Sequence, residues 1–383
     1  MRANPVGERK VVEHLEALFE EDLHAKRVMS MAHATLGAME ATSLSIHAIG
    51  RGMAMARSVT RKHGVKQVDR FLSNSAIDPW ELAARWVPHV LAQRTEAVVA
   101  LDWTEFDADD HSTLVASLVT SHSRTTPLLW KTVQKSALKG QRNAIEDALL
   151  VRLDEVVPEG VRVTILADRG FGDQELYRLL GEFGFDYVIR FREIIAVTDE
   201  TGESRPARDW VPSNGRAKMI KSARVTADGT AVPAVVCMKA KGMKEAWCLA
   251  TSRVDLAPKP VVDLYARRFT IEESFRDIKD MRFGMGLGAM HVKDTGRRDR
   301  LFLISALAIA LLTLLGAAGE AAGIDRLFKV NTAKTRQYSL FRQGCDYYDF
   351  LPGMRDSWLH PLMENFARLL NDHSVFKHAM GLI

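Results

Sequence analysis

The chain has 383 residues, of which 47% are apolar and 26% are charged, as expected for a soluble globular protein of about two or three domains. Cys237, Cys248 and Cys345 show no C-x-x-C spacing, which disfavours a disulfide framework or a structural zinc site and indicates a reducing cytosol. The net charge of +4 allows an anionic partner without requiring one, and the N-terminus has no apolar signal segment, so we expect a cytoplasmic protein.

Residues 1 to about 93 are predicted to be helical. An amphipathic helix is expected from Glu8 to Arg27, and a second helix from Ser43 to Lys62, ended by the pair His63 and Gly64. A third helix is expected to begin at Val65 and to end near Asn74. Two helices joined by a short turn that contains glycine are the outline of a helix-turn-helix unit.

One face of this third helix is basic. Lys66 and Arg70 lie one turn apart, and Gln67 lies beside Lys66. Such a face is suited to contacts with nucleic-acid phosphates and base edges. The alternative is a solvated basic face on a plain helical bundle, and the sequence leaves both interpretations open.

From about residue 94 the pattern changes to short apolar runs that are typical of strands. Three early runs are followed by alternating helix and strand, which predicts a mixed α/β sheet. The predicted strands are 97–102, 113–120, 127–133, 161–167 and 186–191, and the predicted helices are 141–156 and 173–182.

Residues 193–257 interrupt this alternation and are predicted to form a β-rich insertion. Its expected strands are 194–198, 218–225, 232–238 and 246–251, separated by glycines. Pro258 and Pro260 then begin a helix, because proline is tolerated in the first helical turn.

The helix that follows carries the most informative pattern in the chain. Tyr265, Arg268, Glu272 and Lys279 are spaced Y-x2-R-x3-E-x6-K, which places them within roughly 60° of one another on a helix, with Arg276 beside them. A carboxylate flanked by cations on one face is suited to hold a metal ion beside a phosphate chain. The pattern therefore predicts a site that cuts nucleic acid.

Two more carboxylates follow predicted strands. Asp102 ends the first strand and Asp168 follows the run 161–167, so both are expected at one edge of the sheet, with Glu272 packed across it. Three oxygen ligands of this kind fit two Mg²⁺ ions roughly 4 Å apart, as two-metal phosphoryl transfer requires. Each has an alternative: Asp102 and Asp168 as turn or cap residues, and Glu272 as part of a salt-bridge ladder.

The segment 301–319 has no charged residue and is long enough to span a bilayer. It lacks an aromatic belt, and it directly follows the charged helix. A helix buried on all sides has the same composition, so we expect a core helix and no membrane partner. After residue 319 comes a tail, predicted to be partly helical from His360 to Asn371.

The Y-x2-R-x3-E-x6-K helix, with Asp102 in Leu-Asp-Trp-Thr-Glu-Phe and Asp168 in Leu-Ala-Asp-Arg-Gly-Phe-Gly-Asp, resembles the bacterial cut-and-paste insertion-sequence transposases. These belong to the DDE superfamily, whose catalytic core is RNase H-like. The resemblance implies a metal triad of Asp102, Asp168 and Glu272, loaded with two Mg²⁺ ions for which Mn²⁺ can substitute. It also implies double-stranded DNA partners (transposon ends and target), a homodimer in the DNA complex, and association with the nucleoid.

The resemblance assigns further roles residue by residue. Tyr265, Arg268 and Lys279 match the signature positions that contact the backbone of the transposon end, and Arg276 lies on the same face. Trp247, in the strand region before this helix, matches a tryptophan that stacks on a flipped base while a hairpin forms. A core tryptophan in a strand is the alternative, and Trp210 is the less favoured candidate for the same role.

The resemblance covers nearly the whole chain and suggests five parts. They are a helical DNA-end-binding domain (1–93), the first part of the core (94–192), the β-rich insertion (193–257), the second part of the core (258–319) and the tail (320–383). Two other functions remain open: a DNA-binding relative without catalysis that acts as a repressor, and a metal-dependent nuclease without strand transfer.

Overall fold

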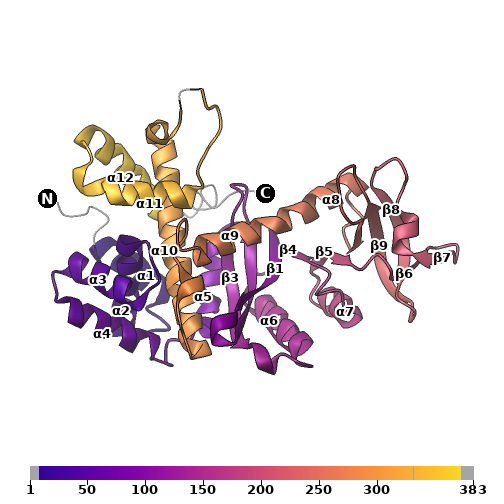
Figure 1. Cartoon of the computed structure of the whole chain (residues 1–383), viewed down its shortest axis with the longest axis horizontal. Helices are drawn as coiled ribbons and strands as arrows, with labels where there is room; N and C mark the ends of the chain where they lie inside the picture. The colour runs from indigo at the N-terminus through magenta and orange to yellow at the C-terminus, as the bar shows by residue number, and fades with distance from the viewer. Residues whose placement is uncertain (1–7, 331, 372–383) are drawn as a thin grey trace.

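The structure, a computed structural model, describes residues 8–330 and 332–371. Its central strands are β1 (Glu96–Phe106), β2 (His111–Val119), β3 (Thr125–Gln134), β4 (Arg162–Ala167) and β5 (Asp186–Phe191). The insertion adds β6 (Ala196–Thr198), β7 (Ser204–Pro206), β8 (Lys218–Val225), β9 (Thr230–Met238) and β10 (Trp247–Thr251). All lie in one sheet of order β3-β2-β1-β4-β5-β10-β9-β8-β6-β7 (Figure 1).

The predicted mixed α/β sheet is confirmed. β1, β2 and β3 pair antiparallel, whereas β1, β4 and β5 pair in parallel. The insertion strands were predicted closely, except that the short β7 was missed, and they extend the central sheet through antiparallel pairing of β10 with β5. A long hydrogen-bonded ladder therefore connects the first strand to the insertion.

Helices cover both faces of the sheet. α6 (Arg142–Val156) and α7 (Gln174–Glu182) lie on one face, and α8 (Pro258–Ala266) and α9 (Thr270–Lys279) cross the other (Figure 1). The structure has two hydrophobic clusters, and alternate residues of β1 pack into one or the other. Val98 and Ala100 pack in one cluster with Val261, and Val99 packs in the other with Leu150. Burial of each such valine or leucine side chain contributes about 1.5–3 kcal/mol, which fixes the register of the strand and hence the position of Asp102.

Asp102 lies inside β1 rather than at its end, so the predicted strand boundary was wrong. The antiparallel partner β2 extends the pairing as far as Phe106, whereas the parallel partner β4 stops pairing at Ala100 opposite Leu166. Asp168 follows the end of β4 immediately. Asp102, two residues beyond Ala100, therefore lies beside Asp168, two residues beyond Leu166, at the same edge of the sheet.

The N-terminal region is helical, with α1 (Glu8–Phe19), α2 (Ala25–Ala41), α3 (Ile46–Arg57), α4 (Arg61–Leu72) and α5 (Pro79–Leu91). Two predicted boundaries were wrong: the first helix ends at Phe19, and the break between α3 and α4 falls before Arg61 instead of at His63 and Gly64. Gly64 lies inside α4, where a Cβ would stand only 2.1 Å from the carbonyl oxygen of Gly50. This glycine permits two helices to touch and does not end one.

The Tyr265 to Lys279 region is not one continuous α-helix. α8 ends at Ala266, residues Arg267–Phe269 form a 3₁₀ turn, and α9 begins at Thr270. The tighter turn changes the angle between Tyr265 and the residues of α9, so Tyr265 faces the core while Glu272 faces solvent.

The apolar segment 301–319 lies within α10 (Thr295–Ala321). In the described part of the chain, α10 is the one helix whose length and composition would suffice to cross a membrane, but 89% of its most apolar window is buried. It packs against α2, β3, α11 (Leu340–Phe350) and α12 (Asp356–Asn371), between the N-terminal helices and the sheet (Figure 1). This burial favours the core-helix interpretation. The tail contains α11 as well as the predicted helix near its end.

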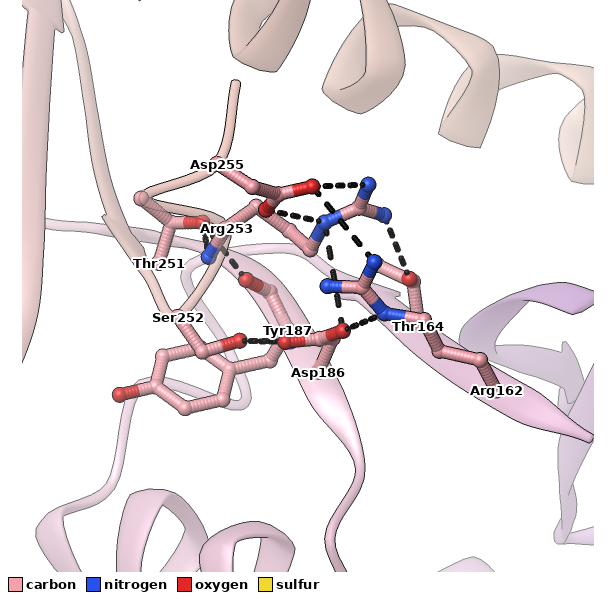
Figure 2. Close-up of polar contacts among 8 residues, drawn as sticks. All are labelled: Arg162, Thr164, Asp186, Tyr187, Thr251, Ser252, Arg253 and Asp255. Atoms are coloured by element: carbon pink, nitrogen blue, oxygen red, sulfur yellow. Dashed lines mark hydrogen bonds and ion pairs between the residues drawn. The ribbon is translucent and has the colours of Figure 1, made fainter. Parts of the chain in front are cut away.

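The amino edge of the sheet, opposite Asp168, is joined by a polar network (Figure 2). Arg253, at the end of the insertion, donates to both carboxylate oxygens of Asp255 at 2.9 Å and to Thr164 of β4 at 3.1 Å. Asp186 of β5 accepts from Arg162 and Ser252, each at 2.6 Å. These bonds attach residues 252–255, which lead from the insertion into α8, to the starts of β4 and β5. They therefore help to position α8 and α9 relative to the sheet.

We expect Arg253→Leu to lower the free energy of unfolding by about 1.5–3 kcal/mol, because Arg253 is buried and the substitution removes its hydrogen bonds to the Asp255 carboxylate and to Thr164. The hydrogen bond from Arg253 lowers the pKa of Asp255 from 3.8 to about 2, so the stabilisation by this pair is present above about pH 4 and is lost as the pH falls toward 2. Denaturant unfolding at pH 7 and pH 3 measures both effects. A variant that unfolds like the parent at pH 7 would contradict the role of the network.

Candidate active site

The three predicted carboxylates line one open cleft of about 590 Å³, although they come from three separate elements. Asp102 comes from β1, Asp168 from the loop after β4, and Glu272 from the first turn of α9. Asp102 is mostly buried, whereas Glu272 is half-exposed. Asp168 also accepts a hydrogen bond from the Gly170 backbone at 2.7 Å, so the turn proposed as its alternative is present too.

Arg268 connects two of these carboxylates. Its Nη1 lies 3.0 Å from Oδ2 of Asp102, and its Nη2 lies 3.1 Å from Oε1 of Glu272. The i,i+4 pair with Glu272 was foreseen as a salt-bridge alternative, but the contact with Asp102, 166 residues away, was not. The Arg268 side chain is only 6% exposed and Asp102 is mostly buried, so the contact between these two is shielded from water and from screening by salt, whereas the contact with half-exposed Glu272 is less so.

The electrostatics of Asp102 show how crowded this cleft is with negative charge. Burial, together with the charges of Asp168 and Glu272, raises the pKa of Asp102 to about 6 against the opposing effect of the Arg268 charge. The Arg268 charge alone does not bring the pKa of Asp102 back to its ordinary value. Additional positive charge in the cleft would therefore stabilise the ionised form of Asp102.

The two other basic residues of α9 differ in their surroundings. Lys279 donates from Nζ to the Glu105 carbonyl at 2.6 Å and to Oγ1 of Thr104 at 3.1 Å, and burial lowers its pKa. Arg276 is exposed and paired with Glu273 at 3.0 Å. Both line the cleft of the carboxylates. Arg276 is thus accessible to a ligand without rearrangement, whereas Lys279 also fixes α9 to the end of β1.

Tyr265 and Trp247 form an aromatic cluster next to the cleft. Tyr265 is 1% exposed, and its ring lies edge-on to Trp247 with centroids 5.0 Å apart. Trp247, at the start of β10, is half-buried and stacks on Phe269 at 5.8 Å. Phe269 was not foreseen, although its position in the Tyr265–Phe269 run was a signal. Trp210 is buried, with its indole N–H bonded to the Val197 carbonyl, which is the environment of a core tryptophan.

The predicted contact residues of the N-terminal region lie apart from this cleft. Lys66 and Arg70 are exposed on α4, whereas the Gln67 side chain is bonded to Arg57 at 2.9 Å and to His63 at 2.9 Å. α4 packs against α10, and α9 lies on the far side of α10 (Figure 1). The structure therefore brings Lys66, Gln67 and Arg70 to one helix but not to the three carboxylates.

The sheet edge that carries Asp168 continues into a row of cations, which we call the basic rim. The end of β5, the start of β10, the end of β9 and the start of β8 all fall on this edge, according to the strand register. The exposed basic residues there include Arg192, Arg216, Lys239, Lys241 and Lys244. Within the described residues, none of the five has an acidic partner within 4 Å. Four strand spacings of about 4.8 Å extend this edge about 19 Å from β4 to β8.

The carboxylates fit a divalent metal by their chemistry. Asp102, Asp168 and Glu272 supply hard oxygen donors, and the raised pKa of Asp102 marks a place where added positive charge is stabilising. Across residues 8–330 and 332–371, no three carboxylate, histidine or cysteine side chains already converge on one point as a metal-binding group. The Arg268 guanidinium bridges Asp102 and Glu272 with its two terminal nitrogens.

A mixed sheet with three antiparallel strands continued by two parallel ones, and with carboxylates at its carboxyl edge, defines an RNase H-like fold of the kind that transfers phosphoryl groups in nucleic acids. Within that class, the model of the Transposase DDE domain family matches residues 93–311, and the chain belongs to this family. A comparison with curated proteins gave no match. The match begins just before β1 and ends within α10, so it includes all three carboxylates.

Proposed function

We propose that the chain binds the terminal inverted repeats of an insertion sequence, cleaves the DNA at these ends and joins the freed 3′-hydroxyl to target DNA. The observation that carries this proposal is that Asp102, Asp168 and Glu272 line one cleft in a chain of the transposase family. DNA binding without catalysis would not require three carboxylates from three elements at one place.

The three carboxylates, two basic residues of α9 and the neighbouring aromatic residues have different parts in the proposal. Asp102, Asp168 and Glu272 would hold two Mg²⁺ ions, or Mn²⁺ in their place, which would neutralise charge at the scissile phosphate and activate the attacking oxygen. Arg276 binds the backbone of the strand being cut, and Lys279 positions α9 against β1. Tyr265 sits beneath Trp247 and supports it, while Trp247 stacks on an unpaired base next to the cut.

The basic rim supports a DNA path that continues from the cleft. Its length of about 19 Å corresponds to about five or six nucleotide steps of 3.4 Å along one strand. Unpaired exposed cations at that spacing suit phosphate contacts, and they lie on the Trp247 side of the cleft. Lys66, Gln67 and Arg70 on α4 would bind a more distant part of the end, and two copies of the chain would serve the two ends.

The salt dependence of DNA binding tests this path. We expect Lys241→Ala combined with Lys244→Ala to reduce the slope of log affinity against log salt concentration by up to about 1.8, since each phosphate contact contributes about 0.9. Arg178→Ala combined with Lys259→Ala removes the same charge from exposed positions on α7 and α8 and should leave the slope within about 0.3 of the parent. Equal slopes for the two double variants would contradict a DNA path along the basic rim.

The proposed activity is tested with a supercoiled plasmid that carries the inverted repeats flanking the gene. With Mg²⁺, we expect cleavage at the ends and joined products in a target plasmid. Cleavage without joined products would identify a nuclease without strand transfer. Binding that is unaffected by EDTA, without cleavage in any metal, would identify a DNA-binding relative that acts as a repressor.

A further inference from the structure

Arg268 occupies the position where a cation between Asp102 and Glu272 would bind. Its two terminal nitrogens donate to Oδ2 of Asp102 at 3.0 Å and to Oε1 of Glu272 at 3.1 Å. A divalent cation bound by the same two carboxylates needs oxygen lone pairs at about 2.0–2.1 Å, in nearly octahedral geometry. A guanidinium and a dication placed between the same two carboxylates repel each other and need the same space, so the arginine and the metal compete for these oxygen atoms.

The contacts of Arg268 are strong enough for this competition to matter. The guanidinium is almost fully buried, and a paired charge in such a place is screened far less than one at the surface. Phe269 lies 4.7 Å from the guanidinium carbon and covers one face of it. A buried, bidentate arginine of this kind must give up real interaction energy before a second cation can take its carboxylates.

The same arginine is also able to leave. Its Nε is buried and has no hydrogen-bond partner among the described residues, so the guanidinium is held by the two carboxylates, by Tyr265 and by the Phe269 ring. Glu272, one of the two, is 53% exposed and can turn away from Arg268 without unpacking the core. The cleft beside them is open to solvent and reaches Arg276.

We propose that Arg268 is a resident counter-ion of the carboxylate triad, and that divalent cations bind by displacing it from Asp102 and Glu272. This inference rests on the proposed function, because it takes these carboxylates as the metal ligands. The displaced guanidinium is then free to bind an anionic oxygen of the DNA backbone. Metal loading and strand contact at this residue are thereby linked, so DNA that captures Arg268 strengthens metal binding, and the reverse also holds.

The test is the affinity of the full-length protein for Mn²⁺ without DNA, measured by calorimetry and by the electron spin resonance of free Mn²⁺. We expect Arg268→Gln to bind Mn²⁺ at least about tenfold more tightly than the parent, because it frees both carboxylates. Arg267→Gln removes the same charge from the adjacent residue of the 3₁₀ turn, which is exposed and does not line the cleft, and its affinity should stay within about threefold of the parent. An Arg268→Gln protein with parental or weaker affinity would overturn the proposal.

Arg268→Lys separates competition for oxygen atoms from simple charge repulsion. Lysine keeps the positive charge but has one ammonium group in place of the two-pronged guanidinium, so we expect an affinity for Mn²⁺ between those of the parent and Arg268→Gln. Parental affinity in Arg268→Lys would mean that only the charge matters, and would refute displacement. This variant also preserves a test if Arg268→Gln fails to fold.

A further substitution identifies the ligands. Adding Glu272→Gln to Arg268→Gln should abolish the gain in Mn²⁺ affinity, and persistence of the gain would refute competition at these carboxylates. If Glu272→Gln alone leaves parental Mn²⁺ binding unchanged, the metal assignment of the proposed function fails instead. The two failures are therefore distinguishable without any cleavage assay.

Discussion

Replacing Glu272 with glutamine is expected to reduce the rate of DNA end cleavage by at least about 10³-fold, equivalent to about 4 kcal/mol in the activation free energy. Glutamine has the same shape but lacks the negative charge that the proposed metal ions and the adjacent Arg268 require. Glu272 is half-exposed and belongs to no hydrophobic cluster, so the protein should fold as before. Single-turnover cleavage of a labelled transposon end in Mg²⁺ measures the effect.

The next residue along α9 offers a matched control. Glu273 has the same charge and a similar exposure, but it pairs with Arg276 and does not line the cleft of the carboxylates. Glu273→Gln should therefore cleave within about threefold of the parent. Melting temperatures within a few degrees for both variants would show that neither loses its fold. Parental cleavage by Glu272→Gln would remove Glu272 from the catalytic assignment.

The carboxylates could be predicted from the sequence because apolar strands have a simple periodicity and a predictable edge. The run before Asp168 was placed almost to the residue, since a buried strand in a parallel pair is apolar throughout. The end of β1 was misplaced, because its last residues pair with β2 through contacts that local sequence does not encode. Asp102 still lies beside Asp168, because this neighbourhood depends on where β4 ends and not on where β1 ends.

The β1 partners of Arg268 and Lys279 could not be predicted from the spacing of residues along a helix. Spacing identifies neighbours on the same helix, such as Glu272 for Arg268, but the opposing residues Asp102 and Thr104 come from a strand far away in the chain. The burial of Tyr265 was missed for a similar reason. A 3₁₀ turn of three residues rotated it toward the core, and no residue in that turn marks it as a boundary.

The two cores differ in what they do for the cleft. The smaller cluster lies between the sheet and the α8–α9 pair, and it contains Tyr265 and Ile271 on either side of Arg268. It therefore sets the distance of Glu272 from β1. The larger cluster extends through α10 to the N-terminal helices and α11, so it holds together the parts that the proposed DNA path would connect. Close packing along α10 is the feature of this larger core that single substitutions can test.

Two glycines allow α10 and α11 to touch backbone to backbone. A Cβ on Gly344 of α11 would stand 1.8 Å from the Leu312 carbonyl oxygen of α10, and a Cβ on Gly316 of α10 would stand 2.0 Å from the Leu340 carbonyl oxygen of α11. The contacts are reciprocal, and in both cases the obstacle is backbone. Neither helix can relieve the clash by turning a side chain, so the helices must separate.

We therefore expect Gly344→Ala to lower the free energy of unfolding by at least about 3 kcal/mol and to reduce soluble expression, since overpacking against rigid backbone exceeds the usual 1–3 kcal/mol. Gly181→Ala, a substitution of the same kind in α7, meets nothing within 4 Å and should instead stabilise the helix by about 0.5–1 kcal/mol. Denaturant unfolding of both variants measures the two changes in the free energy of unfolding, which we expect to have opposite signs. α10 also carries Arg298, whose buried guanidinium bonds to Asp109 and His111 just after the end of β1. Separation of α10 from α11 should therefore also disturb the sheet edge near the cleft. A Gly344→Ala protein as stable as the parent would show that α10 and α11 do not pack at this distance.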